Sequence, residues 1–349
     1  MLKPTAAPSD IVSDIRRKTS VANLNNLTRT SAYLQFYLNH PEVEWALLAH
    51  LISRNGGWNM TDLRGDWLPR LLKTDEIKSF YAFLERCNWL IFHDAYAQLL
   101  LYERMKQTGD DLTSLLPSLG VSLFMVPIWR DFLTHQDSHI LTWALIINEQ
   151  HYIEQRVVKH PFYQSNILRT FEFNAQSVLS LNQVLLPYLH STGDPYLKLV
   201  GITVHDFPSV EHRIQVGKTL YHLLFGDQER FSKILMWAKA VPHTGSRANY
   251  WPHVFSTVKQ TPESYTKTYE ERLKGAFLLP GKPKIYSPTL SAAWKNTEHP
   301  PADGVDWYRD RKWIEYLNPG ELLPTITEED YVDALHRVEI GLKLFGKVT

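Results

Sequence analysis

The sequence has 349 residues, of which 44% are hydrophobic and 21% are charged, and 37 Lys and Arg residues balance 37 Asp and Glu residues. This composition is typical of a globular protein and argues against a disordered chain. A neutral chain also lacks the broad basic field that duplex nucleic acid requires, so we do not expect nucleic acid as a partner. The one strongly basic run, Arg16, Arg17 and Lys18, is best interpreted as a solvated helix face.

The single cysteine, Cys87, cannot form an internal disulfide, which fits a reducing compartment. Cys87 lies in a helical pattern of apolar residues, so we expect a buried, unreactive thiol. The N-terminus has no apolar signal-peptide region, and no stretch approaches the roughly 18 apolar residues of a transmembrane span. These features predict a cytoplasmic protein without membrane association.

Taken in order, the chain predicts a flexible tail over residues 1–8 and a helical body over residues 9–240, with no Gly/Ser-rich linker to divide it. Strict alternation of apolar and polar residues, the pattern of a strand, is scarce. Only residues 198–203 could form either a short strand or a helical turn. We therefore expect an all-α fold with one large domain. The expected helices include residues 10–24, 74–87, 94–109, 140–158, 174–189, 208–225 and 229–240.

Residues 241–326 have a different character, because ten prolines punctuate them and aromatic residues are frequent. A loop-rich segment with so much apolar surface must pack on something. We expect it to wrap around the helical body, and residues 327–349 to form a final helix.

The central stretch is residues 40–63, HPEVEWALLAHLISRNGGWNMTDL. Its apolar residues cover nearly every helix face, which predicts a buried core helix. Gly56 and Gly57 are predicted to end this helix, because glycine readily adopts the left-handed conformation of a C-cap. A polar loop with Asn59 and Asp62 would follow.

Two polar loops are candidates for a binding site, one after the central helix and one at residues 243–249. Glycines allow backbone N–H groups to approach an anion, and Arg54 and Arg247 would add positive charge. We expect both arginines to share a cluster with Asp62. The alternative is that the glycines end helices and each arginine pairs with a nearby acid. The candidate ligand-binding residues are His50, Arg54, Asn55, Asn59, Asp62, His243, Ser246, Arg247 and Asn249.

Other site chemistry is poorly supported by the sequence. Glu149, His151 and Glu154 share one long predicted helix, but a di-iron bundle needs Glu-x-x-His motifs on paired helices. His135 and His139 lack the glutamate of a zinc protease motif. We expect no metal site, and the sequence assigns no catalytic residue and no cofactor.

Several stretches resemble a known family. NLNNLTRTSAYLQFY at residues 23–37, the central stretch, HTGSRANYWPHVF at residues 243–255 and SPTLSAAWKNTEH at residues 287–299 are similar to the YppC-like family of uncharacterised proteins from Bacillus and relatives. The resemblance extends to about residue 313. It implies a bacterial cytoplasmic protein but no activity, so no functional residue can be transferred.

Two functions are therefore open. The first is binding of a small anionic ligand, carrying a phosphate or carboxylate, between the loops at residues 54–62 and 243–249, with enzymatic activity not excluded. The second is a non-enzymatic helical interaction module. In that case the polar loops are structural, and an aromatic surface of residues 241–326 contacts a protein partner.

Overall fold

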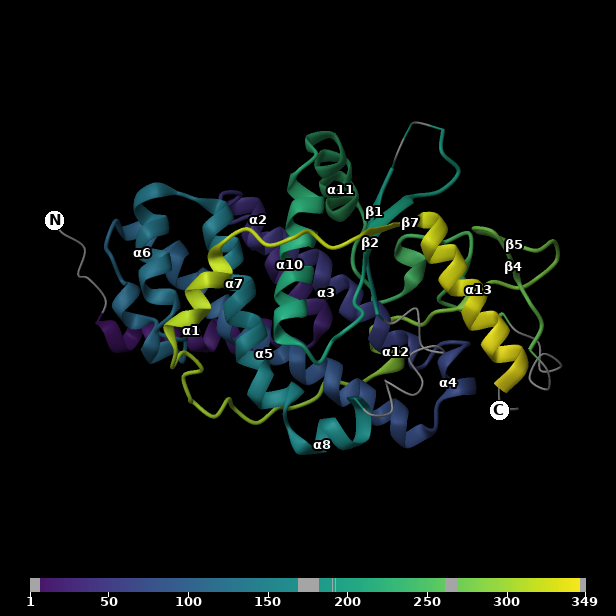
Figure 1. Cartoon of the computed structure of the whole chain (residues 1–349), viewed down its shortest axis with the longest axis horizontal. Helices are drawn as coiled ribbons and strands as arrows, with labels where there is room; N and C mark the ends of the chain where they lie inside the picture. The colour runs from purple at the N-terminus through teal and green to yellow at the C-terminus, as the bar shows by residue number, and fades with distance from the viewer. Residues whose placement is uncertain (1–6, 169–181, 190, 192, 261–268, 346–349) are drawn as a thin grey trace.

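The computed structural model describes residues 7–168, 182–189, 191, 193–260 and 269–345. The described chain is mostly helical, as predicted (Figure 1). Its helices are α1 (Pro8–Ala22), α2 (Asn26–Asn39), α3 (Trp45–Asp62), α4 (Leu68–Leu71), α5 (Thr74–Thr108), α6 (Met125–His135), α7 (Ser138–Ile153), α8 (Pro161–Tyr163), α10 (Val210–Phe225), α11 (Gln228–Ala240), α12 (Leu290–Ala293) and α13 (Glu328–Phe345). None of them combines the length and apolar character needed to cross a lipid bilayer.

Helix α3 lies in the middle of the molecule, between α2, α5, α7 and α10 (Figure 1). Of its 18 residues, 14 are buried. Trp45 and Trp58 are among the largest fully buried side chains of the described chain. The prediction of a core helix at this position is confirmed.

The predicted end of α3 at Gly56 and Gly57 is wrong, because the helix continues to Asp62. A Cβ atom on Gly57 would lie 2.3 Å from Asn26 Oδ1 and 2.4 Å from His243 Nε2. Glycine costs roughly 1 kcal/mol in a helix interior, but here it allows α2 and the segment at His243 to approach α3 closely. Asn59 and Asp62 therefore lie on a helix face and not in a loop.

We predict opposite outcomes for the two glycines. Gly57→Ala should lower the free energy of unfolding by about 1–3 kcal/mol, because the added methyl displaces the buried His243–Asn26 contact. Gly56→Ala is the matched control, since its Cβ would meet only the end of the Asn88 side chain at 3.2 Å. That variant should be neutral or more stable, as for an ordinary helical glycine. Urea denaturation measures both, and equal effects of the two substitutions would contradict this explanation.

A small sheet corrects the expectation of a purely α-helical fold. Strands β1 (Gln183–Tyr188), β2 (Lys198–Thr203) and β7 (Thr325–Thr327) pair antiparallel in the order β1-β2-β7. The helix expected over residues 174–189 is therefore wrong for β1, while residues 174–181 lie outside the described residues. Pro187 is tolerated because β1 is an edge strand, where a missing N–H breaks no central ladder.

Helix α5 runs without interruption from Thr74 to Thr108, where two shorter helices were expected. Cys87 lies on its buried face, 8% exposed, in a second hydrophobic cluster with Phe80, Phe83 and Leu90. Burial raises the pKa of the Cys87 thiol to about 12.

Cys87 should consequently resist thiol reagents in the native protein, because the thiolate is the reactive form. We expect 5,5′-dithiobis(2-nitrobenzoate) to label Cys87 only as fast as the protein unfolds, and rapidly in denaturant. Fast labelling of the native state, with unfolding shown to be slow, would contradict the buried position.

The described parts of the segment at residues 241–326, which are residues 241–260 and 269–326, consist of loops, short helices and short strands laid over the helical body. Trp251 and Tyr250 are fully buried in it. The part that follows η7 (Arg311–Leu317) starts beside α7 and crosses the molecule to β7 and α13 (Figure 1). Residues 1–6 and 346–349, at the ends of the predicted tail and final helix, lie outside the described residues.

Candidate functional site

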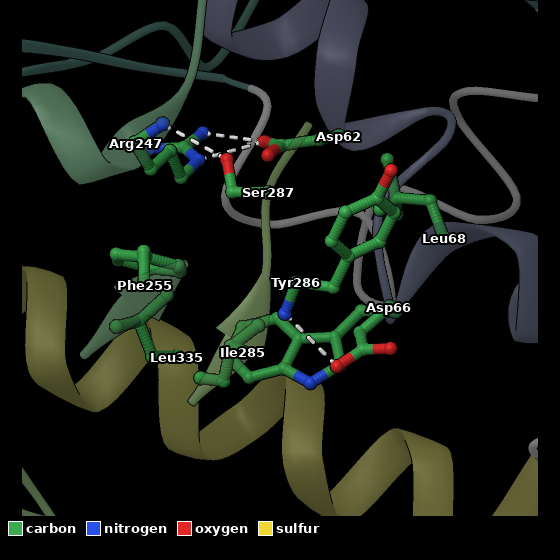
Figure 2. Close-up of a pocket in the computed structure, with 11 residues that line it drawn as sticks. Asp62, Asp66, Leu68, Arg247, Phe255, Ile285, Tyr286, Ser287 and Leu335 are labelled. Atoms are coloured by element: carbon green, nitrogen blue, oxygen red, sulfur yellow. Dashed lines mark hydrogen bonds and ion pairs between the residues drawn. The ribbon is translucent and has the colours of Figure 1, made fainter. Parts of the chain in front are cut away.

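The side chain of Arg247 forms a buried polar cluster with the C-terminal end of α3 (Figure 2). Its Nε and Nη2 atoms donate to Asp62 Oδ2 at 2.8 and 2.7 Å. Nη2 also donates to Asn59 Oδ1 at 3.3 Å, and Nη1 to the hydroxyls of Tyr250 at 2.7 Å and Tyr331 at 3.1 Å. Although burial lowers the pKa of Arg247, attraction to Asp62 outweighs it and raises that pKa well above its usual value.

Arg54, the other arginine of the expected cluster, binds different groups. Its Nη1 donates to the Val241 carbonyl at 2.8 Å, and its guanidinium lies 4.1 Å from the ring centroid of Trp237. Burial lowers the pKa of Arg54 to about 9. Arg54 precedes Asp62 by eight residues, about 12 Å along a helix. Both arginines therefore hold the 241–251 segment on α3, at separate points.

The remaining candidates on α3 bind backbone groups of neighbouring elements. His50 Nδ1 lies 2.8 Å from the Thr30 carbonyl of α2. Burial lowers the pKa of His50 to about 3, so the imidazole is neutral. Asn55 donates to the Leu185 carbonyl at 2.9 Å and accepts from the Leu185 N–H at 2.8 Å. Its amide thus pairs with the free edge of β1 as another strand would.

The candidate residues near residue 245 also form hydrogen bonds with other groups of the protein. His243 Nε2 lies 2.8 Å from Asn26 Oδ1, and burial lowers the pKa of His243 well below its usual value. Ser246 donates to the Ser287 carbonyl at 2.6 Å. Asn249 donates to Thr244 Oγ1 at 2.9 Å and accepts from the Thr244 N–H at 3.1 Å. His243 thus connects the loop to α2, whereas Ser246 and Asn249 bind groups of the loop-rich segment itself.

The space beside the Arg247 cluster is small. A cavity of about 20 Å³ is bounded by Asp62, Asp66, Arg247 and Tyr286 (Figure 2). That is room for roughly one water molecule. Asp66 accepts from the Tyr286 N–H at 3.0 Å and from Arg272 at 2.8 Å, so the second carboxylate is also engaged.

A larger cavity is lined by residues of α2, α3, α5, α7, β1 and α10. Its volume is about 170 Å³, comparable to a cavity of about 150 Å³ that holds benzene. Its walls are mainly apolar or aromatic and contain three ionisable groups of special interest, Arg29, Glu149 and Arg213. The other lining residues are Tyr33, Trp45, Ala49, Ile52, Ser53, Asn88, Ile91, Gln150, Val184, Val204, Phe207, Val216, Gly217 and Leu220.

Both arginines of this cavity have carboxylate partners. Arg29 Nη2 lies 2.5 Å from Glu85 Oε2, and Arg29 Nη1 donates to Asn23 at 3.1 Å. Arg213 forms an ion pair with Glu154 and donates from Nε to Gln150 Oε1 at 2.9 Å. The positive charge of each guanidinium is therefore offset by an acid outside the cavity wall.

Glu149 differs from the two arginines, because no ion pair is found for it among the described residues. It is 9% exposed and accepts from Gln150 Nε2 at 3.0 Å. Burial raises the pKa of Glu149 to about 8, and a hydrogen bond from Trp45 opposes the shift only in part. From the sequence, Glu149 was a candidate only as a metal ligand. A better signal was its place as the one acid in the apolar helix SHILTWALIINEQHYI.

One group of potential metal ligands occurs in the described chain, namely Glu271, His336 and Glu339. Glu339 accepts from the Tyr269 hydroxyl at 2.5 Å and the Arg272 N–H at 2.9 Å, and Glu271 pairs with Lys343 at 2.6 Å. The acids of this group already have structural partners, so we assign no metal to it.

The fold and this cavity define a mostly helical protein with an aromatic, acid-containing pocket between its helices. Residues 21–319 match the model of a protein family of unknown function, DUF2515, and the chain belongs to this family. It is 41% identical over 252 residues to the uncharacterised protein YppC of Bacillus subtilis (strain 168), covering 72% of this chain and 77% of that protein. No solved structure is significantly similar.

Proposed function

We propose that this protein binds a small molecule in the cavity of about 170 Å³ that is lined by Arg29, Glu149 and Arg213. The observation that supports this most is the combination of volume and chemistry. An apolar cavity with a few converging polar groups and an acid of shifted pKa is the usual form of a ligand site. The cavity has about 170 Å³, against about 20 Å³ beside Arg247. Residues from α3 line both, so the central helix remains the element around which the site is built.

An anionic ligand between the two arginine loops is less well supported by this geometry, because the donors of Arg54 and Arg247 are directed at groups of the protein itself. It remains a prediction with a simple test, since inorganic phosphate would have to raise the melting temperature of the wild-type protein but not of an Arg247→Met variant. A cytoplasmic location, supported by the lone cysteine, is likewise part of the proposal.

The cavity proposal is tested with benzyl alcohol, a neutral probe whose ring matches the cavity. We expect saturable binding to the wild-type protein by isothermal titration calorimetry. Ala49→Leu, which places three more carbons in the cavity, should abolish binding without destabilising the protein, since it fills empty space. Ala292→Leu makes the same change at an exposed position of α12 and should bind like the wild type. Equal binding to all three proteins, or to none, would refute the proposal.

The second candidate, a protein-interaction module, is favoured by one feature of α13. Ile340 and Leu344 lie one helical turn apart and are 56% and 68% exposed. Of the aromatic residues in the loop-rich segment, Tyr250, Trp251 and Phe255 are buried, whereas Phe277 is 47% exposed. An Ile340→Lys, Leu344→Lys double variant would leave ligand binding intact and remove an association that depends on α13.

A further inference from the structure

Building on the proposed function, we propose that the cavity lined by Arg29, Glu149 and Arg213 selects a ligand carrying an ammonium group, with Glu149 as its counter-ion. This reverses the ligand charge expected from the sequence. The proposal rests on the arrangement of charged and aromatic groups around the cavity.

Both arginines in the cavity wall are paired with carboxylates. Arg29 and Arg213 are matched by Glu85 and Glu154, with N–O contacts at ion-pair distance. Within the part of the chain that the structure describes, the hydrogen-bond donors to Glu149 are the neutral groups of Gln150 and Trp45. An ionised Glu149 would therefore leave one uncompensated negative charge in a mostly apolar space, where an isolated charge is costly. A cation of suitable size compensates that charge.

Aromatic rings next to Glu149 add a second recognition element. Tyr33 and Trp45 both line the cavity, and their ring centroids lie 5.4 Å apart at an interplanar angle of 88°. Both rings therefore contribute aromatic surface to the cavity wall beside Glu149. A cation held near a carboxylate and an aromatic face is the common arrangement for recognition of amines.

The proton balance of binding follows from the groups that face Glu149. Asp94 from α5 and Tyr33 from α2 interact electrostatically with Glu149, while Arg29 from α2 and Arg213 from α10 line the same cavity. With burial and Asp94 raising its pKa, Glu149 is protonated near neutral pH. When an ammonium ion enters, Glu149 loses its proton to solvent and the ligand keeps its own three N–H protons. Binding therefore releases up to one proton per ligand, and it strengthens as the pH rises toward the pKa of the ligand.

The test compares three probes of one size: benzylamine, benzyl alcohol and benzoate. At about pH 7, where Glu149 is mainly protonated, we expect benzylamine to bind the wild-type protein most tightly. Calorimetry in buffers of different ionisation enthalpy should show proton release with benzylamine and none with benzyl alcohol. Glu149→Gln should lower the affinity for benzylamine by about tenfold or more, as for loss of one buried charge partner. The affinity for benzyl alcohol should be nearly unchanged.

The outcomes separate this proposal from the proposed function. If benzyl alcohol or benzoate binds the wild type as well as benzylamine does, the ammonium preference is overturned and the cavity remains a ligand site. If benzylamine binds without proton release and equally to Glu149→Gln, Glu149 is not the counter-ion. If no probe binds, the proposed function itself fails. Circular dichroism and the unaltered binding of benzyl alcohol show that Glu149→Gln is folded.

Discussion

Replacing Arg247 by Met should lower the free energy of unfolding by about 3–5 kcal/mol, the usual result of removing one partner of a buried ion pair. Asp62 would lose its cation while its side chain is only 15% exposed. The hydroxyls of Tyr250 and Tyr331 would lose a charged donor as well. Equilibrium denaturation with urea measures the effect.

Two further variants show whether the unpaired charge is the cause. Combining Arg247→Met with Asp62→Asn removes both charges. The double variant should recover a substantial part of the lost stability, because the main cost of Arg247→Met is the buried, unpaired charge that it leaves on Asp62. Arg54→Met is the matched control, because its partners are backbone carbonyls and no carboxylate is left unpaired. An Arg54→Met variant as unstable as Arg247→Met would argue against the ion pair as the main contribution.

Stability should also fall as the pH rises from about 6.5 to about 8, with Glu149 as a principal cause; below about pH 6.5 the buried, neutral His50 and His243 act in the opposite direction, because the unfolded chain protonates them. Burial raises the pKa of Glu149 to about 8 from a reference value of 4.5. Between these values the folded protein holds a proton that the unfolded chain releases. Unfolding is therefore favoured by increasing pH, at up to about 1.4 kcal/mol per pH unit for one such group. Asp94, whose pKa burial raises to about 7, acts in the same direction.

Glu149→Gln should make the protein more stable than the wild type above about pH 8 and flatten the pH dependence, because the amide cannot ionise. The control is Glu271→Gln, the same change at an exposed acid whose pKa is lowered by Lys343. Denaturation curves between about pH 5 and 9 provide the comparison. A wild-type slope that Glu149→Gln does not alter would mean that Glu149 is ionised in the folded protein.

Apolar periodicity was a sound guide to the core helices but a poor one to their ends. The pattern of α3 predicted a buried helix, yet the two glycines gave no hint that Asn26 and His243 approach Gly57 within contact distance. That requirement is imposed by segments far away in sequence. The strand β1 was missed for a related reason, since its edge is satisfied by the side chain of Asn55, 130 residues earlier.

The candidate site shows the same limit. Local sequence could suggest that Arg247 and Asp62 meet, because a buried guanidinium needs acceptors, and this ion pair is present. It could not show that tyrosine hydroxyls use the remaining donors, or that Arg54 binds the carbonyls of Val241 and Pro242. The cavity beside Glu149 is formed by residues of several elements from α2 to α10. No local sequence motif predicts such a space.

The most direct test of ligand binding in this cavity is a methyl-detected NMR titration with benzyl alcohol. We predict saturable shift changes at Ile52, Val216 and Leu220, together with nuclear Overhauser contacts from these methyl groups to the probe ring. Ile285 and Leu335, beside the small cavity at Arg247, should not respond. Changes confined to Ile285 and Leu335, or no saturable change at the three cavity residues, would contradict the proposed site.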